Sequence, residues 1–108
     1  MLFNKKTTWE TILSSYTKEP RDVKTVPLYK EGIWFYVYAE NNNIYIENAQ
    51  NHENGSAIKK RRLLDKENFD TMLTLYYKRK KGEKVSKEAI STTHNQVYWY
   101  GIFSDLNL

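Results

Sequence analysis

Apolar and polar positions alternate most clearly in the middle of the chain. Residues 33–39 and 44–47 consist almost entirely of β-branched and aromatic residues, which favour β-strands. Between them lies Glu40-Asn41-Asn42-Asn43, and asparagine adopts positive φ angles at low cost. The pattern therefore predicts an antiparallel hairpin. It also predicts a short edge strand over 26–29 and a further edge strand within 57–64.

The predicted hairpin has two unlike faces. Because side chains alternate along a strand, Phe35 and the aliphatic residues share one face, while Trp34, Tyr36, Tyr38 and Tyr45 share the other. Monomers seldom leave an aromatic face of that size uncovered. Three interpretations stay open: helices cover both faces, a second copy of the chain covers one, or the rings form a platform on which bases stack.

Helical periodicity, with apolar residues three and four positions apart, marks three segments. The first covers 7–16 and is followed by a polar connector over 17–24. The second covers 66–80 and is preceded by Asp65, a candidate N-cap. The third covers 86–103. Its expected buried stripe consists of Ala89, Ile90, Val97, Tyr100 and Phe103, with Tyr98 on the polar side.

Together these elements predict a single α+β domain over residues 1–108. We expect a short N-terminal helix, an antiparallel sheet of three or four strands, and two C-terminal helices packed on the sheet. The chain has no cysteine and is long enough to form a core without disulfides or metal. Lys5 and Lys6 interrupt the apolar start, so we expect no signal peptide, no membrane span and a cytoplasmic protein. The richness in Asn, Lys, Ile and Tyr is a faint indication of a bacterial or phage origin.

The distribution of charge along the chain indicates a possible function more clearly than the overall composition does. The formal net charge is +4, and two runs of four consecutive cations flank the second predicted helix. The runs are Lys59, Lys60, Arg61 and Arg62, and Lys78, Arg79, Lys80 and Lys81. A helix of about fifteen residues is roughly 22 Å long, so its two ends can reach phosphates that far apart. Either run alone is explained as solubilising surface, but the two together favour a polyanionic partner.

The segment 69–103 resembles a helix-turn-helix. The residues that its second helix would bring to bases or to the backbone are Lys87, Ser91, His94 and Asn95. The turn over 81–85 is longer than usual, the first helix is long, and a hairpin precedes the pair. Simple antiparallel packing of two helices on a sheet explains the same residues, so both interpretations stay open.

No catalytic constellation is recognisable in the chain. Its only histidines are His52 and His94, and neither has a nucleophile or a metal ligand beside it in the sequence. We therefore expect a non-catalytic protein with no cofactor and no metal site.

Two binding functions follow from these features. The leading hypothesis is a small basic regulatory or accessory domain that binds nucleic acid, with the two basic runs on phosphates. The alternative is a protein-interaction module, an inhibitor or adaptor that binds an acidic protein surface. The surplus of aromatic residues also favours a homodimer. The candidate interface residues are Trp34, Tyr36, Tyr38, Tyr98 and Trp99.

Overall fold

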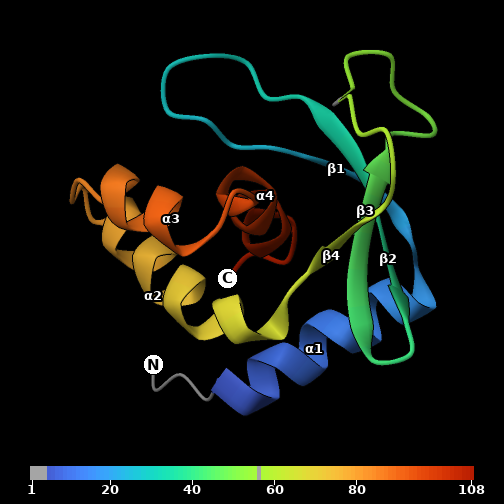
Figure 1. The fold of residues 1–108 in the computed structure, drawn as a ribbon, viewed down its shortest axis with the longest axis horizontal. Coiled ribbons are helices and arrows are strands. Elements are labelled where there is room, and N and C mark those ends of the chain that lie inside the picture. The colour runs from blue at the N-terminus through green and yellow to red at the C-terminus, as the bar shows by residue number, and fades with distance from the viewer. Residues whose placement is uncertain (1–4, 56) are drawn as a thin grey trace.

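The computed structural model describes residues 5–55 and 57–108 and combines an N-terminal helix, an antiparallel sheet and a C-terminal group of helices (Figure 1). The elements in chain order are α1 (Lys5–Lys18), β1 (Arg21–Lys24), β2 (Trp34–Glu40), β3 (Asn43–Asn48), β4 (Arg62–Leu64), the 3-10 helix η1 (Lys66–Asn68), α2 (Phe69–Lys80), α3 (Ser86–Thr92) and α4 (Gln96–Asp105). The four strands pair in chain order, each antiparallel to the next. The predicted α+β fold class is confirmed.

The β2–β3 hairpin agrees with the sequence pattern. Asn41 and Asn42 have φ angles of 51° and 63°, the two positive values that a tight hairpin turn requires. Tyr38 lies opposite Tyr45, so both side chains point to the same face of the sheet. The other face carries Phe35, Val37, Ile44 and Ile46, which are fully buried.

Helices pack on one face of the sheet within the described part of the chain. α1 contacts β2 and β3, α4 contacts β1, and the three C-terminal helices lie together on one side of the sheet (Figure 1). The aromatic side chains of the other face are only half-buried. The interpretation in which helices cover both faces is therefore wrong for residues 5–55 and 57–108.

The first strand lies at a different place from the predicted one. Residues 21–24, within the predicted polar connector, form β1, whereas residues 26–29, the predicted edge strand, belong to a loop. β1 buries only one apolar side chain strongly, Val23, so its hydrophobic signal is weak. The carbonyl oxygen of Val26 accepts a hydrogen bond from Arg79 of α2 instead of joining a ladder. At the opposite edge of the sheet, the predicted strand within 57–64 is confirmed. It is short, because β4 contains only the three residues Arg62–Leu64.

α1 and α2 bury the faces that the periodicity predicts. α1 extends beyond the predicted 7–16 at both ends. The buried residues of the two helices include Trp9, Ile12 and Tyr16, and Phe69, Met72, Leu73 and Tyr76. Asp65 is confirmed as an N-cap, because its Oδ1 accepts the amide of Glu67 at 2.9 Å. The capped turn is η1, which leads directly into α2.

The predicted helix over 86–103 is two helices. α3 ends at Thr92, Thr93 is extended with φ −162° and ψ 149°, and α4 begins at Gln96. The amide of Asn95 donates to Thr93 Oγ1 at 3.1 Å. Threonine side chains often make such local bonds, which compete with helical hydrogen bonding.

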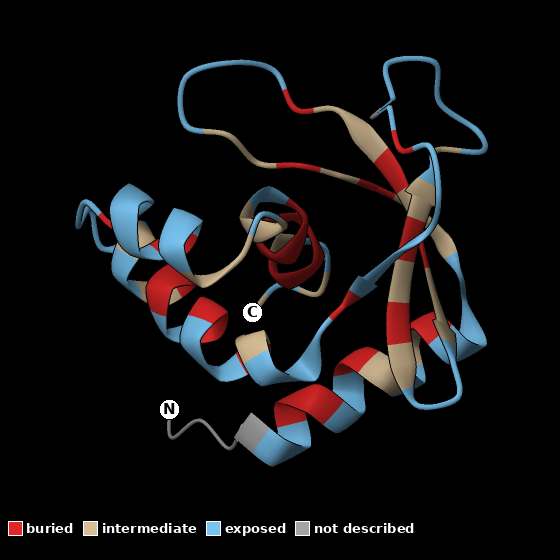
Figure 2. Cartoon of the chain, viewed as in Figure 1, coloured by how far each residue is buried: buried red, intermediate tan, exposed pale blue. Residues whose placement is uncertain are grey.

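This break changes which residues of the segment are buried. Tyr98, expected on the polar side, is 8 % exposed, whereas Ile90 and Val97, expected in the stripe, are 58 % and 40 % exposed. α4 is buried nearly all round (Figure 2). Trp99 is fully buried in the core of the chain, so the predicted place of Tyr98 and Trp99 in an interface is corrected. The stripe positions that are buried as predicted are Ala89, Tyr100 and Phe103.

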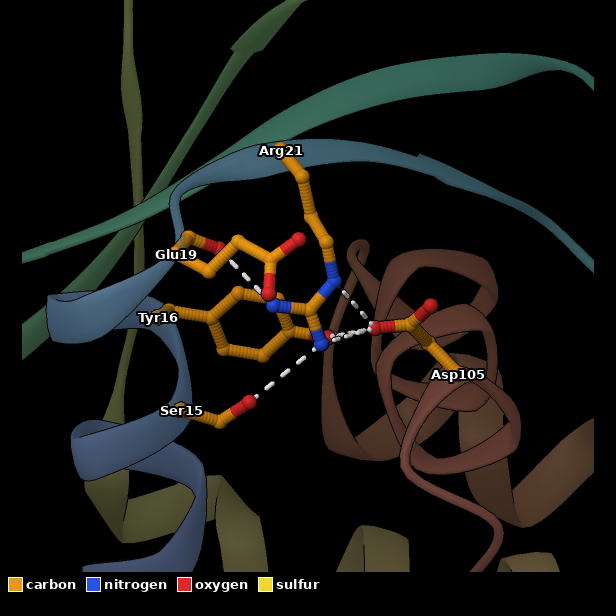
Figure 3. Close-up of polar contacts among 5 residues, drawn as sticks. All are labelled: Ser15, Tyr16, Glu19, Arg21 and Asp105. Atoms are coloured by element: carbon orange, nitrogen blue, oxygen red, sulfur yellow. Dashed lines mark hydrogen bonds and ion pairs between the residues drawn. The ribbon is translucent and has the colours of Figure 1, made fainter.

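Asp105, the last residue of α4, joins three elements (Figure 3). Its Oδ2 accepts from the hydroxyl of Tyr16 at 2.8 Å and from Arg21 Nε and Nη2 at 3.1 and 2.6 Å. Arg21 also donates to Ser15 Oγ and to the carbonyl of Glu19. Burial, and then the charge of Asp105, raises the pKa of Tyr16, so its hydroxyl stays a donor. α1, β1 and α4 are thereby linked by one polar cluster.

Gly101 allows α4 to approach the sheet closely. A Cβ at this position would lie 3.0 Å from the carbonyl oxygen of Lys24 and 3.1 Å from ring atoms of Phe35. We expect Gly101→Val to lower the free energy of unfolding by about 2 kcal/mol, because overpacking typically costs about 1–3 kcal/mol. Urea unfolding measures this loss. Gly55→Ala is the control, since its Cβ would make only ordinary contacts; equal stability of both variants would contradict the close packing of α4.

Candidate binding surface

The outer side of the sheet carries a row of aromatic side chains, which we call the aromatic face: Trp34, Tyr36, Tyr38 and Tyr45. The ring centroids of Tyr36 and Tyr38 are 6.0 Å apart. Those of Tyr38 and Tyr45 are 5.7 Å apart, with only 24° between the ring planes. Alternate residues of a strand are about 6.7 Å apart, so the row follows β2 and turns onto β3. The result is a strip of half-buried π surface.

Arg61 covers the β4 end of the aromatic face. Its guanidinium lies 4.1 Å from the ring centroid of Tyr45 and donates to the Tyr38 hydroxyl at 3.2 Å and to Glu40 at 2.9 Å. Burial raises the pKa of Tyr38, although the bond from Arg61 acts in the opposite direction. The hydroxyl therefore stays protonated at neutral pH. A planar cation thus extends the aromatic surface.

Asp22 and His52 close the β1 end. The Asp22 side chain is 2 % exposed and accepts the amides of Gln50 and Asn51 at 2.9 and 2.7 Å. His52 Nδ1 lies 2.8 Å from Asp22 Oδ2, and the imidazole is stacked on Trp34 with 3.5 Å between centroids and 10° between planes. Desolvation alone would raise the pKa of Asp22, but its hydrogen bonds to Gln50, His52 and Asn51 outweigh that effect and lower it.

Asp22 makes the loop after β3 sensitive to acid. A carboxyl with a lowered pKa in the fold stabilises the protein above its unfolded pKa of about 3.8, and this contribution is lost as the pH falls through the folded value. We expect Asp22→Ala to lower the free energy of unfolding by about 1–3 kcal/mol at neutral pH. The difference from the wild type should shrink below about pH 4. Urea unfolding at a series of pH values tests this; a constant difference would contradict it, and Glu53→Ala is the control.

The first basic run divides between the two faces of the sheet. Lys59 and Lys60 are exposed and precede Arg61, which lies on the aromatic face. Arg62 points to the other side, where it donates to Asn95 Oδ1 at 3.3 Å. Three of the four predicted cations are therefore at or beside the β4 edge of the aromatic face.

The second basic run lies at the end of α2, which Figure 1 places across the molecule from the sheet. Arg79 is half-buried and bonded to the carbonyl of Val26. Lys80 Nζ donates to a backbone carbonyl of the C-terminal residue at 2.9 Å. Lys78 and Lys81 are exposed. This run therefore serves partly to hold the fold together, and it does not share a surface with the first run.

The residues of the predicted recognition helix separate as well. Lys87 and Ser91 line a shallow groove between α2 and α3, together with Lys78. His94 is exposed in the turn before α4, and Asn95 is half-buried there. α3 has only seven residues. The continuous second helix that a helix-turn-helix requires is therefore not formed over 86–103.

The sequence pattern does not reveal the contact of Asp22, His52 and Trp34. Asp22 falls in a predicted connector and His52 in a polar loop 30 residues later. Pairing of β1 with β2 brings Asp22 beside the aromatic row, and the chain after β3 folds back over it. The one available signal is the alternation of Arg21-Asp22-Val23-Lys24, whose single apolar residue faces the core.

In residues 5–55 and 57–108, no three or more acidic or histidine side chains are placed to hold an ion together. Nor does that part of the chain contain a helix with the length and apolar character needed to cross a bilayer. No family model, curated protein or solved structure shows a significant match to the chain.

Proposed function

We propose that the protein is a non-catalytic domain that binds single-stranded nucleic acid on its aromatic face. The row of half-buried rings along β2 and β3, on the face of the sheet that the described helices leave free, is the observation that carries the proposal. Stacking of a base on an aromatic side chain contributes about 1–3 kcal/mol and is tolerant of sequence. A row of aromatic rings suits unpaired bases, whereas the bases of a duplex are stacked on each other and unavailable.

Cations border the aromatic face on both edges of the sheet. Lys24 Nζ lies 5.8 Å from the ring centroid of Trp34 at the β1 edge, and Arg61 lies over Tyr45 near the β4 edge. Lys59 and Lys60 precede Arg61 and have no ion-pair partner among the residues that the structure describes. Positive charge beside a stacking surface allows phosphates to be neutralised while bases contact the rings.

The proposal is tested by fluorescence-anisotropy titration at two salt concentrations. The labelled probes are oligo(dT), oligo(U) and duplex DNA. We expect both single strands to bind more tightly than the duplex and to lose affinity as salt rises. Absence of binding at low salt, or a preference for the duplex, would count against the aromatic face as the binding site.

The exposed lysines offer a matched pair of variants. For Lys59→Gln with Lys60→Gln, we expect the slope of log K against log salt to fall in magnitude by about 1.4, since each phosphate contact on a single strand contributes about 0.7. Lys78→Gln with Lys81→Gln removes the same charge from the far end of α2 and should leave the slope unchanged. If instead only the variant at Lys78 and Lys81 lowered the slope, the oligonucleotide would bind near the end of α2 and not on the aromatic face.

A protein partner is the second candidate. Glu40 and Glu47 lie on the same side of the sheet as the aromatic row and reduce its positive charge. Tyrosine, tryptophan and arginine are enriched in protein interfaces, and this face combines all three. Light scattering that gives a dimer mass, together with no oligonucleotide binding, would favour a second copy of the chain on this face.

A further inference from the structure

His52 occupies the position of a base on Trp34. The two rings are nearly parallel and their centroids are 3.5 Å apart. The imidazole is bonded to Asp22 through Nδ1, and its side chain is 40 % exposed. Nε2, on the far side of the ring, has no hydrogen-bond partner among the described residues. His52 therefore presents one free ring nitrogen at the end of the aromatic face.

We propose that His52 is a phosphate-binding residue of the aromatic face and acts in its protonated form. This inference rests on the proposed binding of single strands. In a neutral imidazole whose Nδ1–H donates to a carboxylate, Nε2 carries a lone pair and repels an anion. After protonation, Nε2–H becomes a donor and the ring carries a positive charge. The same nitrogen therefore changes from opposing a phosphate to binding one.

The imidazole is held in place before any ligand arrives. Asp22 is fixed by the amides of Gln50 and Asn51, and it in turn orients His52. Stacking on Trp34 restricts the remaining rotation of the ring. A donor that is already ordered loses little conformational entropy on binding, so its contact contributes more to affinity.

Because of the charges around His52, its protonation state determines whether this end of the sheet attracts or repels a phosphate. Asp22 and Lys24 reach this end of the sheet from β1. Glu31, from the loop before β2, lies 3.5 Å from Lys24 Nζ, and Glu53 follows His52 in the chain. With neutral His52, the Asp22 carboxylate is unbalanced and disfavours a phosphate. With protonated His52, that pair is neutral in sum and Nε2–H is a donor for a phosphate.

The test is the pH dependence of oligo(dT) binding between about pH 5.5 and pH 8, the range in which histidine changes charge. We expect affinity to rise as the pH falls, by up to about tenfold per pH unit for one linked proton. His52→Gln should remove this dependence. His94→Gln is the matched control because the chain contains only these two histidines, and it should keep the dependence.

Asp22→Asn provides a second measurement. It removes the counter-charge of the imidazolium, and its single amide oxygen keeps one of the two positions at which Asp22 accepts backbone amides. Affinity should then begin to rise only at a lower pH than in the wild type. Circular dichroism first establishes that each variant is folded.

Three results would overturn the inference: binding of the wild type that is independent of pH, a pH dependence that survives in His52→Gln, or an unshifted midpoint in Asp22→Asn. Absence of oligo(dT) binding at every pH contradicts the proposed function itself. The two failures are therefore distinguishable.

Discussion

Tyr38→Ala combined with Tyr45→Ala is expected to weaken oligo(dT) binding about thirtyfold or more, because each lost base stack removes about 1–3 kcal/mol. These two rings form the most nearly parallel pair of the aromatic face, and Arg61 lies against one of them. Both side chains are only half-buried, so their loss should leave the core intact. Anisotropy titration in one buffer compares the variant with the wild type.

Two controls separate the rings from other effects of this substitution. Tyr38→Phe with Tyr45→Phe keeps both rings and removes the hydroxyls, so its affinity should stay close to that of the wild type. Tyr29→Ala removes a tyrosine that is 97 % exposed in the loop after β1, and it should bind normally. An alanine pair that binds as well as the wild type, or a phenylalanine pair as weak as the alanine pair, would show that base stacking on these rings does not occur.

The hairpin could be predicted from the sequence because its signals are local and agree with one another. Strand-forming residues, their alternation, and the asparagines of the turn all indicate the same structure. The alternation also separates the aromatic row from the aliphatic core face. The aromatic face could therefore be predicted from the sequence alone, but the sequence did not show that the helices in residues 5–55 and 57–108 leave this face free.

Tertiary contacts decided the parts that sequence patterns miss. β1 contains one buried apolar residue, Val23. The other contacts of this strand are polar: Arg21 donates to Asp105, and Asp22 accepts from Gln50. At the break between α3 and α4, the amide of Asn95 donates to the side chain of Thr93. The spacing of apolar residues does not predict such a hydrogen bond. In α4, buried residues occur on nearly every side of the helix, so periodicity does not single out one stripe that faces the core.

The charge pattern was the least reliable guide to the candidate site. Two similar basic runs are equivalent in the sequence, yet only the first reaches the aromatic face. In the second, Arg79 and Lys80 are bonded to carbonyl oxygens of the chain itself. Whether a cation is available to a ligand depends on which backbone oxygens lie within its reach, and those oxygens come from segments far away in the sequence.

Asp105→Ala is expected to lower the free energy of unfolding by about 2–4 kcal/mol, the sum of lost hydrogen bonds and of a buried donor left without a partner. Tyr16 is fully buried, and its hydroxyl loses the acceptor that lies 2.8 Å away (Figure 3). Arg21 is 25 % exposed, so water can satisfy part of its guanidinium. Most of the cost therefore falls on Tyr16. Urea or thermal unfolding at neutral pH measures the loss.

A double-mutant cycle shows whether the cluster acts as a unit. Tyr16→Phe alone removes the hydroxyl and should cost about 1 kcal/mol. In a Tyr16→Phe background no buried hydroxyl is left unsatisfied, so Asp105→Ala should cost less than it does in the wild type. Glu83→Ala, an exposed carboxylate in the turn after α2, should cost almost nothing. Additive losses in the cycle would mean that the Tyr16 hydroxyl and Asp105 contribute independently, so that the hydrogen bond between them does not help to hold α4 to α1.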